Sequence, residues 1–377
     1  MKSFERQIID SREYRPAIEK ALLETYFLDY DKHFLHSQEG RRDIENNVFR
    51  RYEHALRHVV PWLRRQKTLS GAKVLEIGSG TGSSTAALAH YVDSVNGYDI
   101  HQPSLAGARR RMQIMGLENV RLHLVAETDL VERIQSDTDG LYDIILLYAV
   151  LEHQTIAERH ATLKKCWELL QEEGVLAVVD TPNILHYFDL HSSKLPFLHM
   201  LPDRLYAGYA SKSSREAFAD SFAEIPASAE ELEVKIARWG RGVSFHDFEL
   251  VFGTGYSDLL VAEGFEPEIL DWFPCTVEEE LLRWYVEHKE FAIPAGFTRC
   301  VLNLIFKKSA ERSRSDNIAA PPSFSSLQDF APGRLLHLEA QLQEQADQIR
   351  SIYRSKTWRA GRIVAGPYHF FHNILRG

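Results

Sequence analysis

A glycine-rich turn carries the clearest chemistry in the sequence. The buried-strand pattern Val74–Ile77 leads directly into Gly78, Gly80 and Gly82, which occupy every second position. Glycines at a strand-to-helix turn let the backbone bend sharply and let a ligand approach where a side chain would collide. The spacing differs from the G-x-G-x-x-G pattern of dinucleotide-binding enzymes, because position 83 is Ser83. We therefore expect a ligand site at this turn and disfavour a nicotinamide-dependent dehydrogenase.

Two acidic residues accompany the glycine turn. Glu76 lies two positions before Gly78, and Asp99 closes the next apolar run, 21 residues after Gly78. An acid at the tip of the second strand of an open sheet lies beside such a turn, where it can accept hydrogen bonds from ribose hydroxyls. The alternative for Asp99 is a solvent-exposed turn residue that caps the following helix.

The elements that position these residues alternate between short β-branched runs and helical stretches. This alternation indicates right-handed βαβ units and a parallel sheet with helices on both faces. We predict an α/β fold with a Rossmann-like, doubly wound, mostly parallel sheet, whose last strand enters at an edge. The predicted strands are Lys73–Ile77, Ser94–Asp99, Val120–Val125, Tyr142–Leu147, Gly174–Asp180 and Val301–Lys307.

The segments around this sheet differ in composition. Residues 1–70 place apolar residues at three- and four-residue spacing and predict an N-terminal helical segment. The central domain is expected to span 71–308, with an insertion at about 184–299 that is rich in aromatic residues and histidines. Prolines and serines in 309–333 predict a flexible linker, and 334–377 predict a short coiled coil followed by a basic, aromatic tail.

Taken together, the motifs resemble the class I S-adenosylmethionine-dependent methyltransferases over about residues 56–308. The resemblance implies that S-adenosyl-L-methionine is the cofactor. The matching segments are Glu76-x-Gly78-x-Gly80-x-Gly82, then Asp99, Ala126–Asp129, Tyr142–His153 and Leu169–Leu176.

The resemblance also implies roles for individual residues. Glu76 would face the methionine end of the cofactor, with the loop of Gly78, Gly80 and Gly82 passing beneath it. Asp99 would bind the ribose. The remaining expected contacts are to the adenine, with Glu127 at its amino group and with Ile100 and Ala126 flanking its ring. Many members carry Asp where this chain has Glu127, so its reach is one methylene longer.

The acceptor side requires different chemistry. A hydroxyl acceptor benefits from a general base, whereas a carboxylate acceptor needs none. We predict that His153 or His191, which follow the fourth and fifth strands, takes the acceptor proton, and that Asp189 orients or charges its neighbour. The alternative for each histidine is a purely structural role, as a packed or hydrogen-bonded side chain. Because no pair of histidines after the fifth strand has metal-binding i, i+4 spacing, we expect no metal.

Further segments resemble proteins of glycan assembly. Thr181–Pro202 and Gly242–Glu249 resemble a subgroup of bacterial methyltransferases found with cell-surface polysaccharide enzymes, and Ile352–Arg359 resembles the S-x-S-W-R tail of glycan-assembly proteins. This implies an O-methyltransferase for a hydroxyl of a glycan, glycolipid or nucleotide sugar in envelope polysaccharide assembly. The alternatives are methylation of a small lipid-soluble or quinone-type acceptor, and a non-catalytic scaffold of a glycan-assembly complex.

Composition and charge limit the partners and the cellular compartment that we expect for this chain. The chain of 377 residues has a net charge of −9, which disfavours nucleic acid as a partner. Its three cysteines include no C-x-x-C pair, which favours a reducing cytoplasm. Residues 348–377 carry six Lys and Arg residues and no acid, so we expect this tail to contact an anionic membrane surface or glycan-assembly proteins. We expect a cytoplasmic protein, peripheral at the inner face of the membrane, that forms homo-oligomers through the coiled coil.

Overall fold

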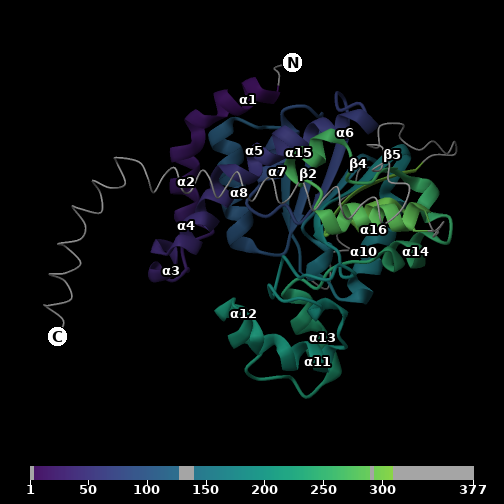
Figure 1. Ribbon diagram of the computed structural model, residues 1–377. Helices are drawn as coiled ribbons and strands as arrows, with labels where there is room; N and C mark the ends of the chain where they lie inside the picture. Colours follow the sequence, from purple (N-terminus) through teal and green to yellow (C-terminus); the bar gives the residue numbers. More distant parts are fainter. Residues whose placement is uncertain (1–3, 127–139, 289–292, 309–377) are drawn as a thin grey trace, which may run out of the picture. The chain divides into compact units, whose positions relative to one another are not determined.

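A seven-stranded sheet forms the centre of the structure, a computed structural model (Figure 1). It describes residues 4–126, 140–288 and 293–308, all within the first of the chain's two units, Met1–Ala320. The predicted linker, coiled coil and basic tail lie outside the described residues. In chain order the strands are β1 Lys73–Ile77, β2 Ser94–Asp99, β3 Val120–Leu124, β4 Tyr142–Tyr148, β5 Leu170–Pro182, β6 Leu260–Ala262 and β7 Val301–Lys307.

The strand order is β3-β2-β1-β4-β5-β7-β6. The first five strands pair in parallel, whereas β7 runs antiparallel to both β5 and β6. The predicted doubly wound, mostly parallel sheet is therefore confirmed. The predicted edge position of the last strand is wrong, because β6 occupies the edge and β7 lies inside it. Five consecutive buried residues in β7 require cover from neighbouring strands, and β6 has only three residues, too few for a strand signal.

Both faces of the sheet are buried, because successive side chains of a strand point to opposite sides. Val74 and Ile144 pack into one apolar cluster, and their chain neighbours Leu75 and Ile145 into another. The first cluster includes side chains of the N-terminal helices and of α7 Ser83–Ala89, α8 Gln102–Met115 and α15 Pro267–Trp272. The second includes side chains of α10 Ile156–Leu169 and α14 Phe245–Phe252. Helix α16 Val277–His288 packs against the 3-10 turn Ala295–Thr298 that precedes β7.

The N-terminal region consists of helices that pack on the first cluster. Two π-helical turns, η2 and η3, interrupt the helical run from Gln38 to Gln66. Arg111 of α8 is 1 % exposed and donates from Nη1 to Val48 O at 3.0 Å and from Nε to Thr81 O at 2.9 Å. It thereby links a π turn to the loop before α7. The elements are α1 Phe4–Ser11, α2 Arg15–Leu23, α3 Lys32–His36, α4 Gln38–Glu45, η2 Asn46–Arg50, α5 Arg51–His54, η3 Ala55–Val59 and α6 Val60–Gln66.

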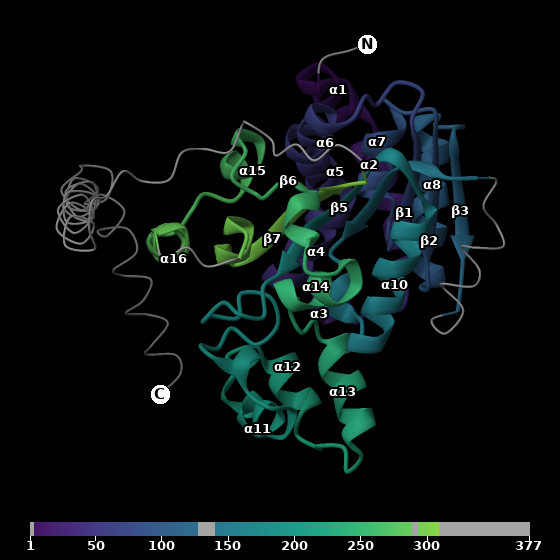
Figure 2. The same ribbon diagram turned by 90° about the vertical axis from the view of Figure 1, so that its right-hand side faces the viewer.

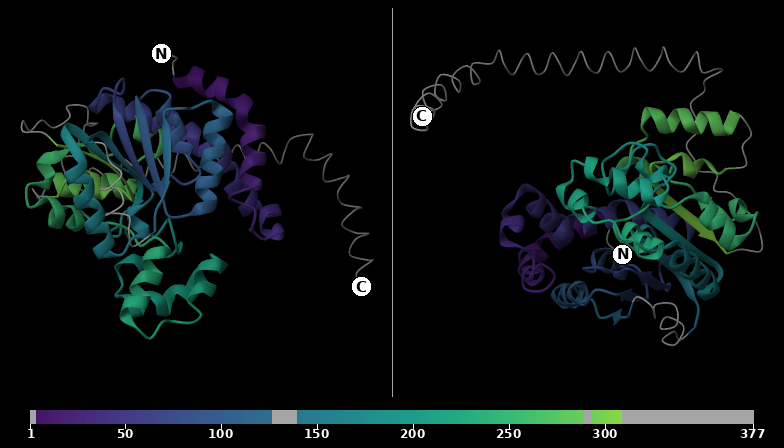
Figure 3. Two further views of the ribbon diagram at one scale, coloured as in Figure 1. Left: turned by 180° about the vertical axis from the view of Figure 1, so that it is seen from behind. Right: turned by 90° about the horizontal axis from the view of Figure 1, so that it is seen from below.

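A group of three helices lies apart from the sheet (Figures 2 and 3). These are α11 Asp203–Tyr209, α12 Glu216–Ser221 and α13 Ala229–Arg238, which share an apolar cluster of their own. Arg238 at the end of α13 pairs with Glu158 of α10 at 2.8 Å and so attaches the group to the main body. After α14 the chain returns to the sheet as β6. Among the described residues, no helix is long and apolar enough to cross a bilayer.

Candidate active site

Three glycines shape the turn between β1 and α7. Gly78, Gly80 and Gly82 have positive φ angles of 76°, 51° and 76°, a region that glycine enters without steric cost. A Cβ on Gly78 would lie 2.4 Å from Val150 Cγ2, and one on Gly82 would lie 2.8 Å from Met112 Cε. A Cβ on Gly80 would meet no atom nearer than 4.0 Å. Packing therefore requires glycine at 78 and 82, whereas Gly80 borders open space.

Asp99 connects the tip of β2 to this turn. Its Oδ2 accepts a 2.7 Å hydrogen bond from the Gly80 N–H, and its Oδ1 accepts a 2.8 Å bond from the His101 N–H just before α8. Asp99 therefore does both things considered from the sequence: it lies beside the glycine turn, and it bonds to the backbone just before the next helix. Each carboxylate oxygen has two lone pairs, so each retains one for a further donor.

Replacing Asp99 by alanine is expected to weaken S-adenosylmethionine binding by about 1.5–3 kcal/mol, the range for lost charge-assisted hydrogen bonds. Isothermal titration of the cofactor into the folded variant measures this change. Asp93→Ala provides the control, because Asp93 is an exposed acid just before β2. Equal affinity in the two variants would remove Asp99 from the cofactor site.

Glu76 lies beneath the glycine turn rather than on the cavity surface. It is fully buried, and its carboxylate accepts hydrogen bonds from the hydroxyls of Ser84 and Thr85. Burial raises the pKa of Glu76 to about 7, against the opposing effect of these two hydroxyls. Glu76 thus fixes the start of α7, and any contact to the methionine end of a cofactor would pass through the loop that it supports.

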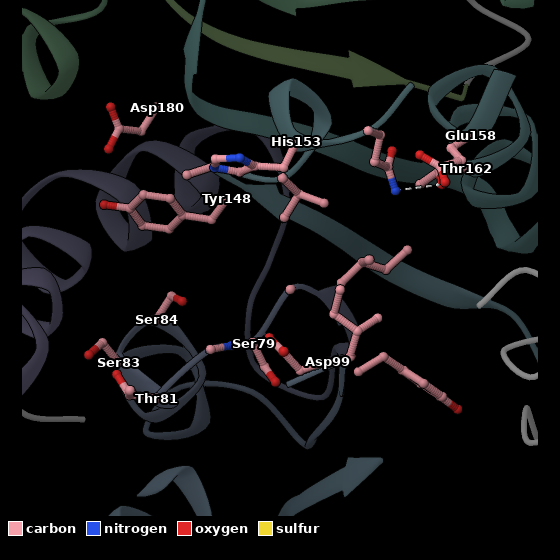
Figure 4. Close-up of a pocket in the computed structure, with 18 of the residues that line it drawn as sticks. Ser79, Thr81, Ser83, Ser84, Asp99, Tyr148, His153, Glu158, Thr162 and Asp180 are labelled. Carbon is pink, nitrogen blue, oxygen red and sulfur yellow. Dashed lines mark hydrogen bonds between the residues drawn. The ribbon is translucent and has the colours of Figure 1, made fainter. Parts of the chain in front are cut away.

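A cavity of about 790 Å³ opens above the glycine turn. Gly78 and Gly80 line it together with Asp99 and Ile100, which is 50 % exposed. Ala126 is exposed just after β3, and Glu127 lies outside the described residues. In Figure 4, Tyr148, His153 and Asp180 lie across this cavity from Ser79, Thr81 and Asp99. The cavity therefore brings the predicted cofactor residues opposite one of the predicted catalytic histidines.

His153 and His191 meet at the far wall of the cavity. Their ring centroids are 5.4 Å apart in an edge-on arrangement, and both side chains line the cavity. Burial lowers the pKa of both imidazoles, that of His191 to about 4, and the proximity of His153 adds to the shift at His191. Both rings are consequently neutral at physiological pH, the state in which an imidazole accepts a proton or binds a metal.

Two buried carboxyl groups lie close to the histidines. Glu152 is fully buried, and neither of its oxygens has a hydrogen-bond partner among the described residues. Burial raises its pKa to about 8. Asp180 at the end of β5 lines the cavity, and burial raises its pKa to about 6 against the attraction of Arg51.

Asp189 has a different role from the histidines. It is 2 % exposed and lines neither the 790 Å³ cavity nor the neighbouring one of about 360 Å³. Its carboxylate accepts hydrogen bonds from the backbone N–H groups of His191, Ser192 and Ser193, and His199 Nε2 lies 3.1 Å from it. Burial disfavours its charge, but these partners outweigh burial and hold the pKa of Asp189 well below its usual range. It positions the backbone of His191 and does not face the reacting groups.

Sequence reasoning missed several residues that line the cavity, among them Asp180, Tyr148 and Arg51. Asp180 ends a predicted strand. Because ligands bind at the carboxyl edge of such sheets, this position could have predicted a site residue. Tyr148 ends β4 in the same way. Arg51 comes from the N-terminal helices, where a charged residue in a helical pattern carries no sign of a site.

Comparisons with known proteins match the part of the chain that contains the glycine turn. Residues 74–174 match the family model described as "Methyltransferase domain". The match covers the glycine turn, Asp99, and the segment that contains Glu152 and His153. Over these residues the chain is similar to methyltransferase domains, and S-adenosyl-L-methionine is the cofactor that such domains bind.

Individual relatives are similar over limited regions. The ubiquinone biosynthesis O-methyltransferase of Glaesserella parasuis is 32 % identical over 110 residues, which are 29 % of this chain and 45 % of that protein. The enzyme of the same name from Pseudomonas aeruginosa is 28 % identical over 115 residues, 30 % of this chain and 47 % of that protein. This chain therefore spans about half the length of the curated relatives that it matches.

Solved structures show partial likeness as well. An S-adenosylmethionine-dependent methyltransferase from Clostridium acetobutylicum has a TM-score of 0.32 and 18 % identity, over 37 % of this chain and 56 % of that one. CalS10, an amino pentose methyltransferase from Micromonospora echinaspora, has a TM-score of 0.30 and 24 % identity, over 38 % of this chain and 56 % of that one. Both likenesses cover little more than a third of this chain.

Proposed function

We propose that this chain transfers the methyl group of S-adenosylmethionine to a hydroxyl of a glycan, glycolipid or nucleotide sugar. The neutral imidazoles of His153 and His191, across the cavity from Asp99, carry the proposal. A sulfonium methyl group is already activated, so the protein must mainly position the acceptor and dispose of its proton. A hydroxyl acceptor needs help with that proton, and the two imidazoles are placed to supply it.

The sugar acceptor is supported by the polar lining opposite the glycine turn, which includes Arg51, Gln154 and Asp180. Such groups pair with hydroxyls, whereas a purely apolar acceptor would leave them unsatisfied. The segments after β5 that resemble enzymes of cell-surface polysaccharide synthesis also favour a sugar acceptor. The adenine and ribose contacts assigned to Ile100 and Asp99 are part of this proposal.

A quinone-type acceptor is the second candidate, and a neighbouring cavity favours it. This cavity of about 360 Å³ shares Asp180 and His191 with the main one. Its other walls include the aromatic residues Phe188, Trp272 and Phe273. An aromatic acceptor ring would fit such walls. The limited similarity to ubiquinone biosynthesis O-methyltransferases is compatible with this candidate.

Replacing either His153 or His191 by alanine is expected to lower methyl transfer by about 10²–10⁴-fold, the usual contribution of acid–base assistance, with nearly unchanged cofactor affinity. Transfer of labelled methyl from the cofactor to nucleotide sugars, oligosaccharides and quinols identifies the acceptor in the same assay. His33→Ala is the matched control, since His33 is an exposed histidine on α3.

The outcomes separate the candidates. Transfer to quinols alone would replace the sugar acceptor by the second candidate. Full turnover in both histidine variants would favour a carboxylate acceptor or another base. An intact chain that binds no S-adenosylmethionine would be a scaffold rather than an enzyme.

Membrane attachment through residues 348–377 is a separate part of the proposal. Each of the six cations contributes about 1 kcal/mol near an anionic surface, so the full chain is expected to sediment with anionic vesicles and to be released by salt. A chain truncated after Lys308 is expected to bind cofactor, to be monomeric and to stay in solution. Zwitterionic vesicles are the control, and equal sedimentation of both chains, or of neither, would contradict the anchor.

A further inference from the structure

Three potential metal ligands converge at the wall of the main cavity. Glu152, His153 and His191 each offer one ligand atom, and these atoms all lie within 4.8 Å of one another. Glu152 and His153 come from the turn after β4, and His191 comes from the segment after β5. The set therefore forms only in the folded chain, because the two histidines are 38 positions apart in sequence.

Glu152 is the buried acid of this set, and the Arg159 guanidinium and the Thr181 hydroxyl favour its charged form. Its side chain is 0 % exposed, and both of its oxygens lack a hydrogen-bond partner among the described residues. Burying a carboxylate whose oxygens accept no hydrogen bond is unfavourable, so buried acidic groups are normally paired or bind metal ions. A cation between Glu152 and the two imidazoles would satisfy these oxygens.

Both imidazoles are oriented as metal ligands usually are. His153 Nδ1 lies 3.2 Å from the carbonyl oxygen of Arg238, which only an N–H can satisfy. His191 Nδ1 lies 3.2 Å from Ser192 Oγ, whose own proton goes to the Trp239 or Gly240 carbonyl at 2.7 or 2.9 Å. Ser192 must therefore accept from His191 Nδ1–H. In both rings the lone pair then resides on Nε2, and an outer partner at Nδ1 is the common arrangement around bound metals.

Gly240 keeps the two rings together. Its φ angle is 97°, and a Cβ at this position would lie 2.6 Å from His191 Cε1 and 3.2 Å from His153 Cε1. Only a residue without a side chain lets the backbone press against both imidazoles at this distance. The backbone of the turn after α13 thus packs against both imidazole rings and limits their orientations.

We propose that Glu152, His153 and His191 bind a divalent first-row transition cation that activates the acceptor hydroxyl. One carboxylate and two imidazoles suit manganese, iron, cobalt or zinc better than magnesium or calcium, and three protein ligands leave positions open for the acceptor. Both histidines line the cavity that the glycine turn also lines, so a cation bound between them would lie at the wall of that cavity.

This inference rests on the proposed function and specifies how the imidazoles act in it. A cation lowers the pKa of a bound hydroxyl by several units, so the acceptor O–H bond breaks and its proton passes to solvent water. The resulting oxygen forms the new bond to the methyl carbon. The bond from that carbon to sulfur breaks at the same time, and the sulfonium leaves as the neutral thioether S-adenosylhomocysteine.

Titration of Mn²⁺ into the untagged full chain, after removal of metals by a chelator, tests the site without any acceptor. We expect one Mn²⁺ per chain, observed by electron paramagnetic resonance and calorimetry, with Co²⁺ and Zn²⁺ competing and Mg²⁺ much weaker. Glu152→Gln, His153→Ala and His191→Ala should each weaken Mn²⁺ binding by about 100-fold or more, since even outer-sphere changes cost 10–100-fold. S-adenosylmethionine affinity, measured on the same samples, should change less than about threefold and reports that each variant is folded.

His160→Ala is the matched control, because His160 pairs with Asp247 at 3.0 Å away from this wall. Mn²⁺ binding that survives all three ligand variants, or that is absent in the parent chain, would overturn the metal site. Methyl transfer that is unaffected by the chelator would also overturn it, and would leave the proposed function intact with the imidazoles as bases. Stoichiometric Mn²⁺ binding without transfer to any hydroxyl would keep the site and overturn the proposed function.

Discussion

Replacing Gly80 by valine is expected to abolish measurable S-adenosylmethionine binding, with a loss of about 100-fold or more, while the protein stays folded. The Cβ of the new residue would meet no protein atom closer than 4.0 Å, so it would project into space that the cofactor needs. The φ angle of 51° adds about 1–2 kcal/mol of backbone strain for a β-branched residue. Calorimetric titration measures the affinity, and urea unfolding measures the strain.

Gly71→Val separates these two effects. Gly71 has a φ angle of 81°, its Cβ position also has no neighbour within 4 Å, and it lies in the exposed turn before β1. This variant should show the strain without the loss of affinity. If Gly80→Val binds the cofactor as tightly as Gly71→Val does, the cofactor does not bind at the glycine turn.

Replacing Arg111 by leucine is expected to lower the free energy of unfolding by about 3–5 kcal/mol. Arg111 satisfies carbonyl oxygens of Thr81, Val48 and Asn47 from a position that is 1 % exposed. Each buried carbonyl left without a partner costs about 1–3 kcal/mol. Because Thr81 belongs to the glycine turn, cofactor affinity should fall together with stability.

Arg110→Leu is the matched control, because Arg110 is the exposed neighbour on the same helix. An exposed substitution of this kind usually changes the free energy of unfolding by less than about 0.5 kcal/mol. Equal urea midpoints for the two variants would mean that the link between the π turn and the glycine turn contributes nothing to stability.

The sheet and the glycine turn were predictable because their signals are local. Short runs that contain β-branched and other apolar residues mark β1, β2 and β4, and Asp99 stands at the end of the second of them. The register that brings Asp99 to Gly80 is the usual consequence of parallel pairing between β1 and β2. β6 escaped notice because three residues are too few to show a period.

The acceptor side was predictable only in part, because it depends on contacts between distant segments. The sequence placed His153 and His191 after neighbouring strands, but it contained no sign that their rings meet or that Gly240 presses on both. Nothing local distinguished the orphaned carboxylate of Glu152 from the fully bonded one of Asp189. Arg111 resembled any other arginine of an amphipathic helix, although it is buried against a π turn.

The carbonyl of Arg238, which ends α13, is the partner of His153 Nδ1, and the carbonyls of Trp239 and Gly240 just after it hold the Ser192 hydroxyl that contacts His191 Nδ1. The α11–α13 group has an apolar cluster of its own. Cooperative units with separate cores can open independently of the rest of a protein. Opening of this group would release both imidazoles while the bond between Asp99 and Gly80 stays closed. Under the proposed function, cofactor binding and the orientation of the imidazoles would then be two separate equilibria in one chain. Substitutions within the helical group would be expected to change acceptor choice more than cofactor affinity.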